Sequence, residues 1–404
     1  MSGGAPIAGL AAYGCAPDRD TIELLRALVL GEPLTEAARA LVWVACAEGV
    51  DRGLVRLLPL LHRHPAAADL DPAIRRRVEH EHRLAGLRFI AVERTARRLV
   101  ETLRPAGIVP MFLKGFPLAS RVYASPALRP MGDLDLAVGP GQLESACVLV
   151  RELGFEEKLE RSLALGPGRH AVTFKRAADA QIVDLHQFVL VCSRWPGADE
   201  RFWARAEPLP VGGAQALTLA PEDHVLHGCL HGYGFHPLYT PFRWMVDVCT
   251  LLARPGFRWE ILLAEAERQR CEGVLAATLG FLDRHLDAPV PAEALARLAS
   301  APRRPVDDAY FRLHGRLDST LATTQRVRAL WASFRRQENL TRAGPLTVIR
   351  WVGRRWQRGS ILETFLEGLR RLPLPATARS KHRQGAGVAA RTRRLRTLAA
   401  RRRP

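Results

Sequence analysis

Two aspartates one residue apart, Asp133 and Asp135, carry the strongest chemical signal in the chain. Side chains alternate along a strand with a period of two, so both carboxylates share one face while Leu134 and Leu136 take the other. Two neighbouring carboxylates repel each other unless a cation lies between them, and a divalent metal is the usual solution in proteins. The pair therefore predicts a metal site on a sheet.

A lysine–glycine pair, Lys114 and Gly115, ends the apolar run that precedes these aspartates. Glycine allows a backbone to approach a phosphate closely, and a lysine ammonium is a compact charge suited to a phosphate oxygen. Only four of the 59 basic residues are lysines, which makes a lysine here notable. A strand-end lysine that reaches solvent is the alternative. With the aspartates, the pair indicates metal-dependent chemistry on a nucleoside triphosphate.

A third carboxylate, Asp184, lies in a later strand candidate with apolar neighbours. By the same alternation, it shares a face with His186. A buried aspartate within an apolar strand is costly unless it is paired or bound to metal. Asp184 is therefore the candidate that would complete a two-metal site.

The elements that must position these residues divide the chain into four regions. Residues 1–104 read as helical, 105–216 as a small mixed sheet with helices on one side, 217–373 as helical again, and 374–404 as a basic, disordered tail. The expected fold class is α+β, with a core of short strands in a small mixed sheet between two helical regions.

Individual elements follow from apolar periodicity and capping signals. A capping box at Asp20 and Glu23 predicts one helix, and Thr35 predicts the start of the next. A long helix is expected over 72–103, and shorter helices over 54–62 (bent or broken by Pro59), 116–123, 140–153, 221–230 and 242–252. Strands are expected at 108–113, 134–138, 155–159, 170–175 and 181–189.

Composition excludes several classes of protein. No apolar run approaches the roughly 20 residues that span a bilayer, and the N-terminus lacks the features of a signal peptide. Seven cysteines without a C-x-x-C pair are typical of reduced thiols, so we expect a cytoplasmic protein. The net charge of +18 is partly local, because residues 379–404 hold ten Lys/Arg and no acid. This tail could bind nucleic acid or anionic lipid, or be a solvated terminus.

The motifs taken together resemble a known family. Lys114 and Gly115, then Arg129-x-x-x-Asp133-x-Asp135, then Val-Asp184-Leu-His, are similar to the uncharacterised bacterial nucleotidyltransferase family of the DNA polymerase beta-type nucleotidyltransferase superfamily. The resemblance covers about residues 20–255, and it continues through residues 217–223 and 242–247 and the histidines between them.

The resemblance implies a two-metal, pyrophosphate-releasing transfer. Asp133, Asp135 and Asp184 would hold Mg²⁺ (or Mn²⁺), and Asp184 would also orient or deprotonate the acceptor hydroxyl. A nucleoside triphosphate, expected to be ATP, would give its NMP group to a hydroxyl of a small molecule or protein. Gly115 and the N-terminus of the helix that follows it would receive the β- and γ-phosphates, and Lys114 and Arg129 would assist.

One departure from the superfamily pattern keeps other functions open. Phe116 follows Gly115, where these enzymes usually carry serine or glycine. A catalytically inactive nucleotide-binding or scaffold protein is therefore one alternative. An RNA-binding protein acting through the basic tail is another, and no other part of the chain suggests nucleic acid.

Further polar residues are expected near the substrate. His186, His231 and Arg243 are candidates to line the cleft, although Arg243 could instead pair with Asp247 four residues later on the same helix. A histidine cluster also offers a zinc alternative. Its members are His224, His227, His231 and His236.

Overall fold

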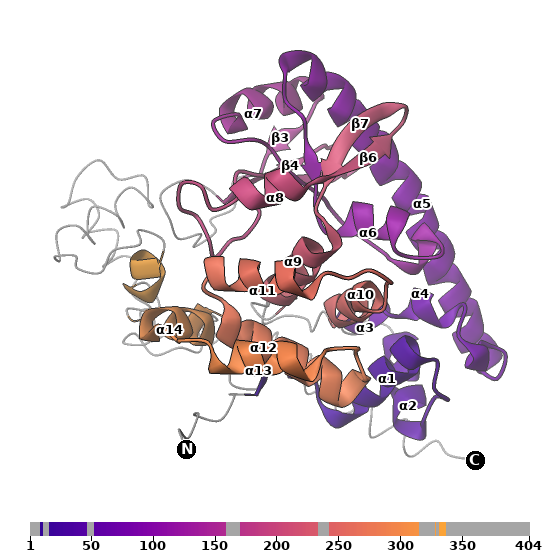
Figure 1. Cartoon of the computed structure of the whole chain (residues 1–404). Coiled ribbons are helices and arrows are strands. Elements are labelled where there is room, and N and C mark those ends of the chain that lie inside the picture. Colours follow the sequence, from indigo (N-terminus) through magenta and orange to yellow (C-terminus); the bar gives the residue numbers. More distant parts are fainter. Residues whose placement is uncertain are drawn as a thin grey trace, which may run out of the picture.

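The computed structural model describes most of the chain up to residue 336. The described residues are 9–10, 16–46, 52–158, 170–232, 242–314, 328 and 331–336. The predicted basic tail, His236 and Cys15 lie outside them. Figure 1 shows the strands at one end of the molecule, most of the helices at the other, and the long helix α5 along one side of both. The predicted α+β class with a mixed sheet is confirmed.

Four short helices begin the chain, and their caps follow from local polar residues. Helix α1 (Arg19–Leu30) is capped by Asp18, whose carboxylate accepts from the Thr21 amide, so the predicted box at Asp20 was two residues late. Helix α2 (Glu36–Cys46) begins after Thr35, as predicted, and the Thr35 hydroxyl accepts from the Ala38 amide. The predicted helix over 54–62 is broken into α3 (Arg52–Val55) and α4 (Leu58–Leu61), and Pro59 lies in the first turn of α4.

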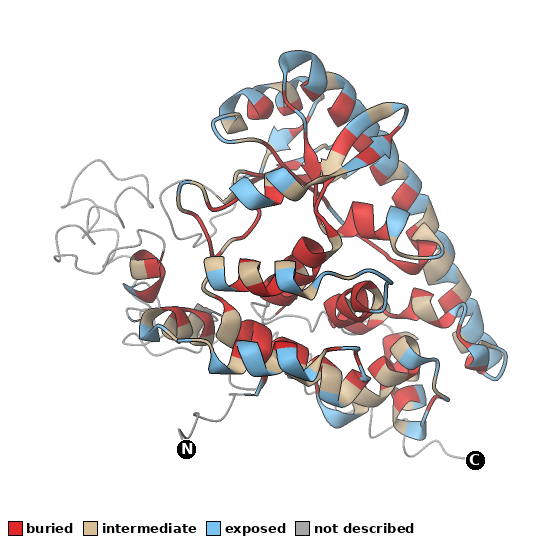
Figure 2. Cartoon of the chain, in the orientation of Figure 1, coloured by how far each residue is buried: buried red, intermediate tan, exposed pale blue. Residues whose placement is uncertain are grey.

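Helix α5 (Pro72–Leu103) has the predicted bounds and is the longest element. Its 32 residues extend roughly 48 Å at 1.5 Å per residue. The Asp71 carboxylate accepts from two first-turn amides and fixes its start. Its inner face buries Phe89, Ala96 and Leu99 against the sheet. The outer face is largely exposed (Figure 2).

The sheet has seven strands in the order β3-β4-β5-β2-β1-β7-β6. Strands β2 and β5 are parallel, as are β1 and β7, and the other neighbours are antiparallel. The strands are β1 (Met111–Phe112), β2 (Leu134–Ala137), β3 (Glu156–Glu157), β4 (Ala171–Lys175), β5 (Ile182–His186), β6 (Glu207–Val211) and β7 (Ala214–Thr218). Helices α6 (Gly115–Arg121), α7 (Leu143–Glu152) and α8 (Glu200–Arg205) lie between them in sequence.

The five predicted strands exist but are shorter, and the β6–β7 hairpin was missed. Prolines at 208 and 210 obscured β6, because proline is tolerated only where a strand lies at the edge of a sheet. The two-residue loop of Gly212 and Gly213 has positive φ at both positions, which is the requirement of a type I′ hairpin turn.

The two faces of the sheet have different environments. Leu134, Leu136 and Val183 belong to a core shared with α5 and α7. The opposite face carries Asp135 and Asp184, and it looks toward the helices that follow the sheet. The site residues therefore stand on a rigid platform whose other side is fully packed.

The helices after the sheet form a second core together with the first helices of the chain. They are α9 (Pro221–Gly232), α10 (Arg243–Leu252), α11 (Trp259–Arg268), α12 (Glu272–Leu286), α13 (Ala292–Ser300) and α14 (Pro305–His314). Helices α9 and α10 are buried along most of their length (Figure 2). They approach closely because Gly232 faces the Trp244 ring, where a Cβ would have no room, and Gly228 faces Val248, where a Cβ would be a tight contact at 3.0 Å.

Two further sequence expectations can be compared with the structure. The six cysteines among the described residues are all free thiols, and most are buried. Within the same residues, no helix is both long and apolar enough to cross a bilayer.

Candidate active site between the sheet and helices α9 and α10

The turn from β1 into α6 places Lys114 in an unusual backbone conformation. Its φ of 51° and ψ of −113° lie in a region that L-residues rarely adopt and that glycine prefers. Strain of this kind concentrates at functional sites. The turn directs the Lys114 ammonium to Asp135, with Nζ 2.5 Å from Oδ1. Burial opposes this charge, but the carboxylates of Asp135 and Asp133 raise the pKa of Lys114 above its ordinary value.

The parallel pairing of β2 and β5 brings two carboxylates side by side. Asp135 and Asp184 are register partners, and one ligand atom each from Asp135, Asp184 and His186 lie within 4.8 Å of one another. Asp133 precedes β2 and contributes an exposed carboxylate to the same cavity. Residues far apart in the sequence thus provide one acidic cluster.

The environment of Asp184 is suited to a cation. Oδ1 of Asp184 is buried and has no hydrogen-bond partner among the described residues, while Thr173 donates a side-chain hydrogen bond to the carboxylate. Burial, with the neighbouring charge of Asp135, raises the pKa of Asp184 to about 6. A carboxylate that is both desolvated and close to another negative charge gains from a bound divalent ion.

A chain of buried histidines extends from the acidic cluster. His186 donates from Nε2 to Asp135 Oδ1 at 3.0 Å, and its Nδ1 lies 3.2 Å from His170 Nε2. Burial lowers the pKa of both histidines well below the ordinary value, so both rings are neutral. With Nε2 of His186 donating, its Nδ1 accepts from His170. These two hydrogen bonds fix the orientation of the Asp135 carboxylate.

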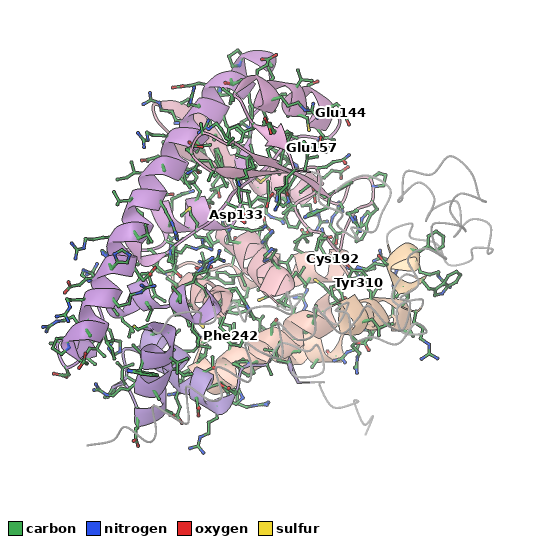
Figure 3. All side chains as sticks on the ribbon, turned by 180° about the vertical axis from the view of Figure 1, so that it is seen from behind. Asp133, Glu144, Glu157, Cys192, Phe242 and Tyr310 are labelled. Carbon is green, nitrogen blue, oxygen red and sulfur yellow. The ribbon has the colours of Figure 1, made fainter. Side chains whose placement is uncertain are left out.

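A cavity of about 270 Å³ connects the acidic cluster with helices α9 and α10. In Figure 3, Asp133 lies near the middle of the molecule, between the strands and these helices. The polar residues that line the cavity are Arg56, Lys114, Arg129, Asp133, Asp135, Asp184, His224, His227, His231, Arg243 and Asp247. All candidate site residues except His186 line the cavity, Gly115 included. His186 lies behind the cavity wall and contacts the lining residue Asp135.

Arg129 is held in the cavity wall by an ion pair that the sequence did not indicate. Its guanidinium binds the Asp247 carboxylate at two points, with distances of 3.0 and 2.7 Å, and Tyr123 donates to the same carboxylate at 2.6 Å. The alternative pairing of Asp247 with Arg243 was therefore wrong. Arg243 donates to the Pro130 carbonyl instead. Packing of α10 beside the segment before β2 decides this partner.

Gly115 and Phe116 have structural explanations in this arrangement. A Cβ at Gly115 would lie 2.9 Å from Nη1 of Arg129, so glycine gives the guanidinium its room. Phe116 points into the core shared with α5, where its ring contacts Phe89 and Phe112. Phe116 is thus a packing residue.

Sequence reasoning missed Arg56, whereas the zinc alternative for the histidine cluster stays a prediction because His236 lies outside the described residues. Arg56 lies in the turn between α3 and α4, and nothing in its local sequence distinguishes it from the other arginines. His224 bonds to the Thr218 hydroxyl, and His227 stacks on His231. Within the described residues, the group spaced for a metal ion is the Asp135 cluster, and the zinc alternative included one residue outside them.

Comparison with known proteins places these residues in context. The family model described as "uncharacterised nucleotidyltransferase" matches residues 55–287, which contain the whole sheet, α9 and α10. A crystal structure of an antigenic nucleotidyltransferase-like protein from Paracoccidioides brasiliensis is similar at 17% identity with a TM-score of 0.35. That match covers 50% of this chain and 95% of the other. No curated protein matches at a significant level.

Proposed function

This chain belongs to the uncharacterised nucleotidyltransferase family, and from that premise we propose that it is a metal-dependent nucleotidyltransferase. It would move an NMP group from a nucleoside triphosphate, ATP in the first instance, to a hydroxyl of a small molecule or protein. Pyrophosphate would be the second product. The observation that carries the proposal is the meeting of Asp135, Asp184 and Lys114 at one cavity.

The residues present fit a divalent cation. Asp135 and Asp184 offer closely spaced oxygens, the buried Oδ1 of Asp184 has no partner among the described residues, and Asp133 lies beside them. These three carboxylates would hold Mg²⁺ or Mn²⁺, since hard oxygen ligands suit both ions. When bound, the cations neutralise phosphate charge and lower the pKa of the acceptor hydroxyl.

The chain's own side chains orient the reactants. Asp184 is ionised near neutral pH, so its carboxylate can accept a hydrogen bond from the acceptor hydroxyl and take its proton as the hydroxyl attacks the α-phosphorus. Lys114 and Arg129 supply fixed positive charge beside the phosphates, and Gly115 gives Arg129 its room. His231 and Arg243 would contact the substrate, and His186 would orient Asp135. Preorganised charge of this kind provides most of the catalysis in phosphoryl transfer.

The direct test is transfer of label. The purified protein is incubated with Mg²⁺ or Mn²⁺, each α-labelled nucleoside triphosphate and a cell extract, and labelled products are separated by size. We expect label in one acceptor fraction, and its loss in Asp135→Asn by at least about 10² because a metal ligand is removed. Asp69→Asn is the matched control, because Asp69 is an exposed carboxylate outside the cavity.

Other outcomes separate the alternatives. Nucleotide binding without labelled product, over a broad range of acceptors, would favour the inactive nucleotide-binding or scaffold protein. Loss of activity only when residues 374–404 are removed, with steep salt dependence, would favour an RNA acceptor bound through the tail. Equal labelling by wild type and Asp135→Asn would contradict the proposed function. We place the reaction in the cytoplasm, where nucleoside triphosphates are abundant and thiols stay reduced.

A further inference from the structure

Four cationic side chains line the cavity, and they differ in their partners. Lys114 contacts Asp135, and Arg129 contacts Asp247. Arg56 and Arg243 form no ion pair with any residue in the described ranges. Arg56 and Arg243 are partly buried, and both line the cavity beside the other two cations and the carboxylates of the acidic cluster. Their charge is therefore available to a ligand in the cavity.

Two guanidinium nitrogens at this wall are buried without a hydrogen-bond acceptor among the described residues. They are Nη1 of Arg129, a residue that is only 4% exposed, and Nε of Arg243. Buried donors almost always find an acceptor, and a charged donor without one is especially costly. Desolvation, together with the nearby guanidinium of Arg129, lowers the pKa of Arg243 to about 9. An anion between these groups would satisfy the donors and relieve their repulsion.

The turn at Gly115 is a weaker place for a phosphate tail. Helix α6 has only seven residues, and Pro117 removes one of its first-turn amides. The Gly115 Cα is also covered, since Arg129 Nη1 and the Met131 side chain lie against it. The next side chain, Phe116, is buried and offers no hydrogen-bond donor. Side chains rather than backbone amides must then supply most of the phosphate contacts.

We propose that Arg56, Arg129 and Arg243 form an anion subsite that binds the β- and γ-phosphates of the nucleoside triphosphate. The subsite deepens the proposed function and rests on it for the identity of the ligand. Its three members come from the α3–α4 turn, the segment before β2 and the start of α10. Arg56 and Arg243 are both close enough to Asp133 for electrostatic attraction, so the subsite adjoins the acidic cluster. A triphosphate chain could therefore contact both.

Inorganic tripolyphosphate tests the subsite without requiring turnover. Its affinity is measured by isothermal titration calorimetry in metal-free buffer, for wild type, Arg56→Gln and Arg243→Gln. We expect each variant to bind about tenfold more weakly or worse, because a charge-assisted hydrogen bond to phosphate is lost. Arg94→Gln, on the exposed face of α5, controls for general loss of positive charge and should bind like wild type.

Two results would overturn the subsite, and neither depends on catalysis. One is an absence of tripolyphosphate binding by the wild type at millimolar concentration. The other is wild-type affinity in Arg56→Gln, a partly buried residue whose replacement breaks no ion pair among the described residues and which stays informative if Arg243→Gln fails to fold. Asp135→Asn should still bind tripolyphosphate. If that binding holds while no nucleotide transfer is found, the proposed reaction fails and the subsite stands.

Discussion

At the scale of single residues, the site depends on close approaches that only particular side chains permit. Lys114 adopts a backbone conformation that glycine would prefer, and its ammonium reaches Asp135 as a result. Gly115 lacks the Cβ that would press on Arg129. The lysine–glycine pair therefore has two different roles. Lysine supplies charge, and glycine supplies space for a second charge.

Gly115→Ala should test the role of that space. The new Cβ would meet Arg129 Nη1 at 2.9 Å, and Arg129 is fixed by Asp247, so the guanidinium cannot move freely. We expect a loss of about 1–3 kcal/mol in the free energy of unfolding, as for other overpacked sites. Chemical denaturation measures it.

Gly280→Ala is the matched control, because Gly280 lies inside α12 with its nearest contact at 3.9 Å. There alanine should stabilise the protein by about 0.5–1 kcal/mol through helix propensity. A Gly115→Ala protein as stable as wild type would show that Arg129 can shift without cost.

At the scale of elements, helix α10 is anchored to the sheet by a buried polar cluster. Arg129 precedes β2, Asp247 lies on α10, and Tyr123 follows α6. All of their contacts converge on one carboxylate. The cluster therefore sets the distance between the acidic residues on the strands and the cavity wall formed by the helices.

Asp247→Asn should weaken this anchor strongly. The substitution leaves the buried Arg129 guanidinium without its counter-charge, so we expect a loss of about 3–5 kcal/mol in unfolding free energy. Tyr123→Phe removes one hydrogen bond and leaves the ion pair, with an expected loss of about 1–2 kcal/mol. Urea denaturation of both variants compares them. Equal losses would mean that the charge of Asp247 contributes nothing beyond a hydrogen bond.

At the scale of the whole molecule, stability should depend on pH through Asp199. This carboxyl accepts from the Val189 amide at 2.8 Å just before α8, and burial raises its pKa to about 7. Because the pKa of Asp199 is higher in the folded than in the unfolded state, its contribution to the unfolding free energy is fully present below pH 3.8, the unfolded pKa. That contribution is lost as the pH rises from 3.8 through the folded pKa of about 7. The loss is about 1.4 kcal/mol per pKa unit.

Asp199→Asn should therefore be more stable than wild type, by a larger margin at pH 8 than at pH 5, and the margin should close as the pH falls toward 3.8. Asparagine can still accept from Val189, and it has no charge to bury. Calorimetric melting temperatures at the two pH values measure the difference. A melting temperature that differs from wild type equally at both pH values would assign the effect to packing instead of ionisation.

The sequence by itself determined which carboxylates are candidates for the acidic cluster, and most of the elements around them. Period-two alternation places Asp133 with Asp135 and Asp184 with His186, whatever the rest of the fold does. Caps and apolar periodicity likewise fixed α5 and the order of the helical and strand regions. These signals are local, so they can be read along the chain. The Gly212–Gly213 turn was an equally local signal for the β6–β7 hairpin, but the prolines of the edge strand obscured it.

Only the tertiary structure decided which residues meet across long separations. It pairs Asp247 with Arg129 instead of with Arg243 on its own helix, and it brings Arg56 from the first helices into the cavity. It also packs α1 and α2 into one core with α10 and α12, although the chain separates them by the whole sheet. The local sequence around an arginine on a helix surface does not indicate which carboxylate it will contact. That choice follows from how the helices pack on the sheet, which depends on the whole buried surface and not on any local pattern.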